Sequence, residues 1–192
     1  MRLRIYTQLF SILILTLLVT KGMGQNETDL EKLRPQIISE QPYEAIYDLL
    51  NEKFPLMKMA KLDGNSLQTT ELIGKKTLIN FWFTNCQPCL DEIPILNEIK
   101  NEMNSEKFNF LAITFQDEAE IKEFLKSNDY HYIHIVNSRN LIDSLGVRFY
   151  PKTVILDQEL NMIRIEKRIP ANSSESEIEI WKQEIINNLK MN

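Results

Sequence analysis

Cysteine is scarce in this sequence: among 192 residues only Cys86 and Cys89 occur, separated by two residues. A disulfide between such close neighbours would close a very short loop, and it would constrain the unfolded chain little. A purely structural bridge is therefore a weak explanation for the pair. Because 43% of the residues are hydrophobic, a core of ordinary size can form without covalent support. The pair is instead expected to have a function.

The sequence also lacks an excess of positive charge. Its formal net charge is -5, and its lysines and arginines are interspersed with acidic residues. Domains that bind nucleic acid usually concentrate basic residues on one face or along one helix. We therefore expect an ordinary charged surface and no nucleic-acid partner.

Long hydrophobic runs are absent as well. The apolar run Leu9–Val19 is shorter than the about 20 residues that a membrane span needs. Two arginines precede it and two glycines follow it, which is the layout of a secretory signal peptide cleaved after Gly24. We therefore expect residues 1–24 to direct export to the periplasm or cell envelope. An uncleaved membrane anchor that extends back to Ile5 is the alternative, whereas a lipid-modified cysteine is excluded because the segment has none.

Hydrophobic periodicity predicts a short helical N-terminal extension over residues 25–53 and an α/β domain over residues 54–192. Asp63-Gly64-Asn65 is a strong turn signal and predicts a hairpin. From Thr77 onward the expected order is strand, helix, strand, helix, strand, helix, strand, strand, helix. This order implies parallel βαβ units followed by an antiparallel pair of strands. The expected strands are residues 77–83, 108–115, 132–136, 152–157 and 161–167, and capping boxes begin helices at Asp117 and Ser174.

The two cysteines stand where a predicted strand ends and a helix begins. The first turn of a helix presents unpaired N–H groups and the positive end of the helix dipole, which stabilise a thiolate. We therefore expect Cys86 to be the exposed attacking sulfur and Cys89, one turn later, to be the more buried resolving thiol. Such a pair can alternate between dithiol and disulfide through a mixed disulfide with a substrate. Cys-x-x-Cys beside a βαβ pattern is the context that favours this reading.

The stretches LINFWFTNCQPCLDEIPIL and GVRFYPKTVILD resemble the thioredoxin-like thiol–disulfide oxidoreductases, in particular the exported TlpA/ResA-like family. The resemblance covers roughly Phe54 to Leu189. It implies a thioredoxin-like fold, in which helices flank a mixed central sheet. It also implies that the protein acts on cysteine-containing client proteins, receives electrons from a membrane-bound donor and needs no small-molecule cofactor.

The resemblance also assigns roles to individual residues. Pro151 matches a cis-proline beside the active disulfide, so Tyr150 and Pro151 are expected to dock the substrate. Glu92 matches an acid found near the disulfide of ResA-like reductases, and it lies three residues past Cys89 on the predicted helix. Trp82 is expected to flank the site as a third substrate-binding residue, with a role in packing alone as the alternative.

Two positions depart from the family pattern. Asn85 stands before the first cysteine, where family members usually have tryptophan. Asn80 stands where thioredoxins carry a buried aspartate that relays a proton to the second cysteine. Because an amide cannot take up that proton, thioredoxin-type proton handling is in doubt.

Three other functions fit parts of the sequence. A metal site could combine the cysteines with His131 and His134, but residues three apart on a strand point to opposite faces, so no metal is expected. A partner-binding module without turnover would not need two oxidisable thiols. A protein-disulfide oxidant or isomerase stays open, but the resemblance favours a protein disulfide reductase because the helical insertion usual in the oxidant branch is missing.

Overall fold

The computed structural model of this protein describes residues 43–103 and 106–191. The chain divides into two compact units, and the second unit comprises Glu44–Asn192. The predicted signal peptide over residues 1–24 lies outside the described residues, as does most of the predicted extension. Within the described ranges, no helix combines the length and the hydrophobicity needed to cross a membrane.

A seven-stranded mixed sheet forms the centre of the second unit, in the order β2-β1-β5-β4-β3-β6-β7. The parallel pairs are β3 with β4 and β4 with β5, whereas β6 and β7 run antiparallel as predicted. The predicted hairpin is also present, because β1 pairs antiparallel with β2. The strands are β1 (Lys58–Lys61), β2 (Ser66–Gln68), β3 (Lys76–Phe81), β4 (Phe108–Ile113), β5 (Ile133–Val136), β6 (Lys152–Leu156) and β7 (Met162–Glu166).

The helices begin where the sequence signals placed them. The side chain of Asp117 accepts a hydrogen bond from the backbone of Glu120, and Ser174 does the same with Glu177, so both capping boxes are confirmed. The predicted helical extension is only a short 3-10 helix in its described part. The helices are η1 (Ala45–Leu49), η2 (Thr69–Leu72), α2 (Gln87–Glu102), α3 (Glu118–Phe124), α4 (Arg139–Ser144) and α5 (Glu175–Lys190).

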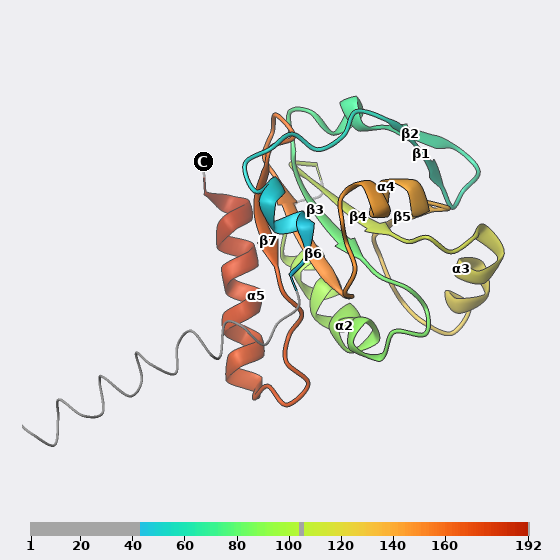
Figure 1. Ribbon diagram of the computed structural model, residues 1–192. Coiled ribbons are helices and arrows are strands. Elements are labelled where there is room, and N and C mark those ends of the chain that lie inside the picture. The colour runs from blue at the N-terminus through green and yellow to red at the C-terminus, as the bar shows by residue number, and fades with distance from the viewer. Residues whose placement is uncertain (1–42, 104–105, 192) are drawn as a thin grey trace, which may run out of the picture. The chain divides into compact units, whose positions relative to one another are not determined.

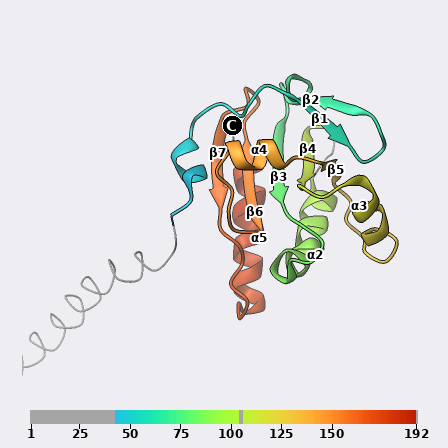
Figure 2. The ribbon, with the colours of Figure 1, turned by 45° about the vertical axis from the view of Figure 1, so that its right-hand side comes forward.

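Helices cover both faces of the sheet, as Figures 1 and 2 show. Successive strand residues point to opposite faces, so each buried strand contributes to two cores. One core joins α2, α3 and α5 to the face that carries Leu78 and Ile155. The other joins η1 and α4 to the face that carries Ile79 and Val154. The carboxyl end of β3 leads from the sheet directly into α2.

Candidate active site

A disulfide joins Cys86 and Cys89 at the start of α2. The strand β3 ends at Phe81, and five residues later Cys86 forms the N-cap of the helix. The backbone N–H of Cys89 points at the Cys86 sulfur, with 3.3 Å between N and Sγ. Pro88 occupies the first turn, where its missing N–H leaves no hydrogen bond unmade. The helix terminus therefore presents an N–H group to the sulfur that was predicted to attack.

The exposure of the two sulfurs partly corrects the sequence prediction. Cys86 is 6% exposed and Cys89 is 1% exposed, so Cys89 is the more buried residue, as expected. Cys86, however, is not an openly exposed residue. It packs in the same core as Trp82 and Ile93, and this packing covers most of its surface. Only a small part of the disulfide therefore remains open to solvent.

Glu92 is a buried carboxyl one helical turn beyond Cys89. It is only 2% exposed, so it is not the ordinary surface acid of a helix. Its Oε1 accepts a hydrogen bond of 2.8 Å from the backbone N–H of Ile169, in the segment after β7. Burial raises the pKa of Glu92 to about 8, although the hydrogen bond from Ile169 and the charges of Arg168 and Lys152 act in the opposite direction. This carboxyl can therefore gain or lose a proton near neutral pH.

The segment that carries Tyr150 and Pro151 lies beside the strand that leads to the cysteines. The peptide bond between these two residues is cis, as the resemblance predicted. Lys152 pairs with Phe81 across β6 and β3, which places the preceding residues next to the stretch between Phe81 and Cys86. The ring of Tyr150 stacks edge-on against Phe83, with 5.3 Å between ring centroids. The predicted docking residues and the disulfide thus belong to one neighbourhood.

Trp82 does not present a surface to a client. It is 0% exposed, and its indole contacts the rings of Phe124, Tyr130 and His134. Direct substrate contact is therefore excluded for Trp82 in this conformation, because every face of the ring is covered by core side chains. Trp82 instead packs in the core, which was the alternative prediction from the sequence. This packing fixes the position of the chain just before Cys86.

Asn80 occupies the core side of β3 at the position of the thioredoxin aspartate. Its Oδ1 accepts a hydrogen bond from the Tyr130 hydroxyl at 3.0 Å, and its Nδ2 donates to Thr153 Oγ1 at 3.2 Å. Both polar groups of the amide are satisfied, so Asn80 links β3 to β6 and to the segment before β5. The buried acid of this site comes from α2, as Glu92, and not from β3.

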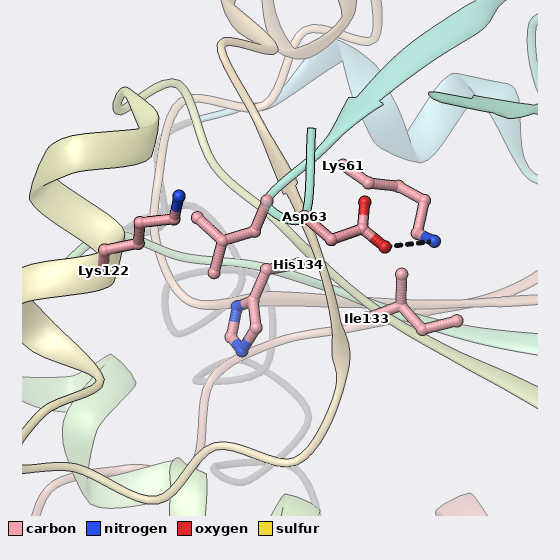
Figure 3. A pocket seen from close by; sticks show the side chains of 6 residues that line it. Lys61, Asp63, Lys122, Ile133 and His134 are labelled. Atoms are coloured by element: carbon pink, nitrogen blue, oxygen red, sulfur yellow. Dashed lines mark hydrogen bonds and ion pairs between the residues drawn. The ribbon is translucent and has the colours of Figure 1, made fainter. Parts of the chain in front are cut away.

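The two histidines have different surroundings. His131 is exposed, whereas His134 is buried in β5 and its Nε2 lies 2.9 Å from the Tyr130 carbonyl oxygen. His134 lines a surface pocket in which Lys61 and Lys122 stand on opposite sides (Figure 3). Both lysines already pair with acids, Asp63 and Glu118. Among residues 43–103 and 106–191, no group of three or more potential ligands is arranged to hold a metal ion.

The fold and the disulfide agree with what sequence comparison finds. The sequence profile of Redoxin matches residues 49–179, which is more than half of the chain. The chain belongs to the Redoxin family.

Relatives of this Redoxin-family chain include two curated proteins. The thioredoxin-like protein YneN of Bacillus subtilis is 27% identical over 56% of this chain and 65% of its own length. The thiol-disulfide oxidoreductase ResA of Halalkalibacterium halodurans is 27% identical over 54% of this chain and 60% of its own length. The chain thus spans less than two thirds of either relative. These matches confirm the predicted resemblance to ResA-like proteins.

Solved structures establish the fold class. The thioredoxin domain of a thiol-disulfide oxidoreductase from Bacteroides vulgatus superposes with a TM-score of 0.59. It shares 19% sequence identity, and the match covers 72% of this chain and 98% of that domain. At this identity the likeness concerns the fold alone. The Redoxin-family chain therefore has a thioredoxin-like fold, as predicted.

Several residues near the site were not identified from the sequence. Phe115 lies 5.6 Å from Phe83 and 6.1 Å from Tyr150 between ring centroids, and the guanidinium of Arg139 lies 3.9 Å from the Phe115 ring centroid. Lys152 forms a buried ion pair with Glu44. A lysine at the start of a hydrophobic strand is the one signal that could have drawn attention to this pair, because buried lysines need a partner. Glu44 itself carries no such signal.

Proposed function

We propose that this chain is an exported thiol–disulfide oxidoreductase that reduces disulfides in client proteins through Cys86 and Cys89. The observation that carries the proposal is the N-cap position of Cys86, whose sulfur receives the Cys89 N–H at 3.3 Å. A thiolate at this position gains a hydrogen bond and the favourable end of the helix dipole. The name of the ResA relative, a thiol-disulfide oxidoreductase, supports the same activity.

The first step is attack of the Cys86 thiolate on a client disulfide. A bond forms between Cys86 Sγ and one client sulfur, and the second client sulfur leaves as a thiolate. Reactivity belongs to Cys86 because it is the more exposed cysteine and the one at the helix N-cap. The product is a mixed disulfide between protein and client.

The second step is resolution of the mixed disulfide by Cys89. The thiol loses its proton, its sulfur bonds to Cys86 Sγ, and the remaining client sulfur leaves. Two electrons pass to the client, and the chain ends in the disulfide form seen in the structure. The reduced form must then be restored by a separate electron donor, which we propose to be a membrane-bound thiol protein.

Glu92 is the proposed proton acceptor for Cys89. It lies one helical turn away, is shielded from water, and has a pKa raised to about 8. An unperturbed thiol has a pKa of about 8.5, so a proton can pass between two such groups with little cost near neutral pH. Asn80 cannot accept the Cys89 proton because its amide does not titrate, so the proposed acceptor lies on α2.

Tyr150 and Pro151 are the proposed docking residues for the client. Tyr150 is half-buried against Phe83 and Phe115. The neighbouring Phe149 is 47% exposed. This aromatic surface lies next to the stretch that ends at Cys86, where an apolar client segment would bring its cysteine to the disulfide.

The deciding experiment is an equilibrium redox titration of the purified full chain in glutathione and dithiothreitol buffers, with free thiols trapped and counted. A single two-electron transition near about -270 mV supports a reductase. A transition near about -120 mV would identify an oxidant or isomerase instead. The absence of any transition would overturn the redox proposal and favour a partner-binding module.

Export is tested separately. The proposal rests on the basic and apolar N-terminal residues, which have the layout of a signal peptide. After expression in a Gram-negative host, intact mass of the periplasmic protein should show loss of residues 1–24. Recovery only from the cytoplasm at full length would contradict export, and recovery from membranes at full length would indicate an uncleaved anchor.

A further inference from the structure

The carboxylate of Glu44 is bound to the segment that precedes β6. Glu44 lies just before η1 and is 3% exposed. Its Oε1 accepts hydrogen bonds from the backbone N–H groups of Arg148, at 3.1 Å, and Phe149, at 3.0 Å. These two donors belong to residues directly before Tyr150. One side chain from the N-terminal part of the unit therefore holds the backbone of the proposed docking segment.

The second oxygen of the same carboxylate holds the other end of that segment. Glu44 Oε2 lies 2.5 Å from Lys152 Nζ, and both side chains are only 4% exposed. Lys152 also donates a hydrogen bond of 2.8 Å to the Tyr47 hydroxyl, and its ammonium lies 4.7 Å from the Tyr47 ring centroid. The carboxylate thus bridges residues on both sides of Tyr150 and Pro151.

The backbone approaches closely at the same place. A Cβ atom built on Gly146 would lie 2.7 Å from the Cβ of Ala45, so only glycine fits here. Gly146 also has φ of +68°, which glycine adopts without steric cost. The contact brings Ala45 and its neighbour Glu44 against the start of the docking segment.

The energetics of this arrangement favour a role in geometry. Burying two charges costs solvation energy, and an apolar pair of similar size often stabilises a fold as well or better. A buried carboxylate, however, can bind two backbone N–H groups and an ammonium at fixed directions, which an apolar side chain cannot do. Among the described residues, the side-chain partners of Glu44 all flank Tyr150 and Pro151.

We propose that Glu44 is a positioning residue for client reduction, holding Arg148, Phe149 and Lys152 so that the Tyr150–Pro151 segment keeps the geometry that docks a client. The inference rests on the proposed reductase function. It predicts that Glu44 affects reactions that need client docking and leaves the intrinsic chemistry of Cys86 unchanged.

The test compares two disulfide substrates for each variant of the full chain. Insulin is a protein disulfide that needs docking, and 5,5′-dithiobis(2-nitrobenzoic acid) is a small disulfide without a peptide backbone. Glu44→Ala is expected to lower kcat/KM for insulin about tenfold, mainly through KM, as a misplaced binding segment does. Glu44→Gln keeps one oxygen acceptor and is expected to lose less. Both variants should react with the small disulfide at the wild-type rate.

Lys182→Gln is the control for loss of a multiple ion pair away from the docking segment. Lys182 pairs with Glu98, Glu102 and Glu179, where α2 and α5 meet. This variant should be less stable than wild type yet reduce insulin normally. If Glu44→Ala fails to fold, the double variant Glu44→Gln/Lys152→Met replaces it, because it removes both charges together. It should retain the fold and still show the raised KM for insulin.

The outcomes separate the inference from the proposed function. If wild-type protein reduces neither substrate, the reductase function fails. If wild type reduces both and the Glu44 variants match it on insulin, the positioning role is wrong. If the variants lose activity on both substrates equally, Glu44 acts on the stability or the chemistry of the disulfide, and the inference is also overturned.

Discussion

The backbone N–H of Ile169 donates a hydrogen bond of 2.8 Å to Oε1 of Glu92. The two residues lie 77 positions apart in the chain, and the contact brings the segment after β7 against the first turns of α2. This one hydrogen bond favours the ionised carboxylate, but burial opposes it more strongly and raises the pKa of Glu92 to about 8. The carboxyl of Glu92 is thus mostly neutral below pH 8, and the ionised fraction that can accept a proton in the proposed mechanism grows as the pH rises toward 8.

Glu92→Gln should change how stability depends on pH. The pKa of Glu92 is about 8 in the folded state and has the ordinary value of 4.5 in the unfolded chain. The stability that this proton contributes is fully present below pH 4.5 and is lost as pH rises through about 8. Relative to wild type, the unfolding free energy of Glu92→Gln should therefore rise by up to about 1.4 kcal/mol per pH unit across this window.

The measurement is denaturant unfolding of both oxidised proteins at a series of pH values. Asp91→Asn is the control, because Asp91 is an exposed acid on the same helix. This variant removes an exposed carboxyl of α2 and leaves the buried Glu92 in place, so it supplies the reference curve. A flat difference between Glu92→Gln and wild type would show that Glu92 ionises normally, which would remove the basis for its role as proton acceptor.

The two cysteine variants should behave differently. Cys89→Ala leaves the attacking thiol but removes the resolving one, so covalent mixed disulfides with a client should accumulate. Cys86→Ala removes the sulfur at the helix N-cap and should be inert. Non-reducing electrophoresis after mixing each reduced variant with insulin gives the answer. Full turnover by both single variants would rule out the proposed mechanism.

Tyr150→Phe should separate client binding from stability. Within the described part of the chain, the buried Tyr150 hydroxyl has no hydrogen-bond partner. Removing it should leave thermal stability unchanged or raise it, because an unpaired buried polar group is unfavourable. A docked client can bond this hydroxyl only if docking shifts the Tyr150 ring and uncovers it, and in that case KM for insulin should rise several-fold with kcat little changed.

Tyr132→Phe provides the comparison for that experiment. Its hydroxyl is also buried, but it donates a hydrogen bond of 3.0 Å to the Leu96 carbonyl. Loss of this bond should cost about 1 kcal/mol of unfolding free energy and leave KM for insulin unchanged. Equal KM values for wild type and Tyr150→Phe would limit the docking role of Tyr150 to its ring.

Gly146→Ala should destabilise the protein more than Gly64→Ala. Both glycines have positive φ, so an alanine at either position should cost roughly 1–2 kcal/mol. At Gly64 the added Cβ meets nothing within 4 Å, whereas at Gly146 it would meet Ala45. Overpacking there should add about 1–3 kcal/mol. Chemical denaturation of both variants tests this, and equal losses would mean that Ala45 does not press closely on Gly146.

Much of the fold was predictable from local sequence signals. The strand and helix order, the hairpin at Gly64 and the capping boxes at Asp117 and Ser174 all depend on residues a few positions apart. The predicted strands 77–83 and 108–115 end earlier, at Phe81 and Ile113, in the structure. The apolar pattern continues past both ends because those side chains pack beside the active site instead of extending the strands.

Some features of the candidate site were likewise predictable from the sequence, and others were not. Cys86, Cys89 and Glu92 share one helix, so their spacing alone predicted that they are neighbours. Burial could not be predicted in this way. Sequence suggested an exposed Cys86 and a Trp82 that contacts substrate, whereas core packing covers both residues. Which surface of a residue remains open depends on every element packed against it.

By itself, the sequence determined the order of the elements, the helix that begins at Cys86 and the family resemblance, because these features depend on neighbouring residues. Only the tertiary structure decided the pKa of Glu92 and the role of Glu44. The Glu92 carboxylate accepts a hydrogen bond from Ile169, 77 positions away, and the Glu44 carboxylate accepts one from Lys152, 108 positions away. Desolvation and long-range hydrogen bonds arise from chain segments that only folding brings together. They cannot be predicted from residues that are close together in the sequence.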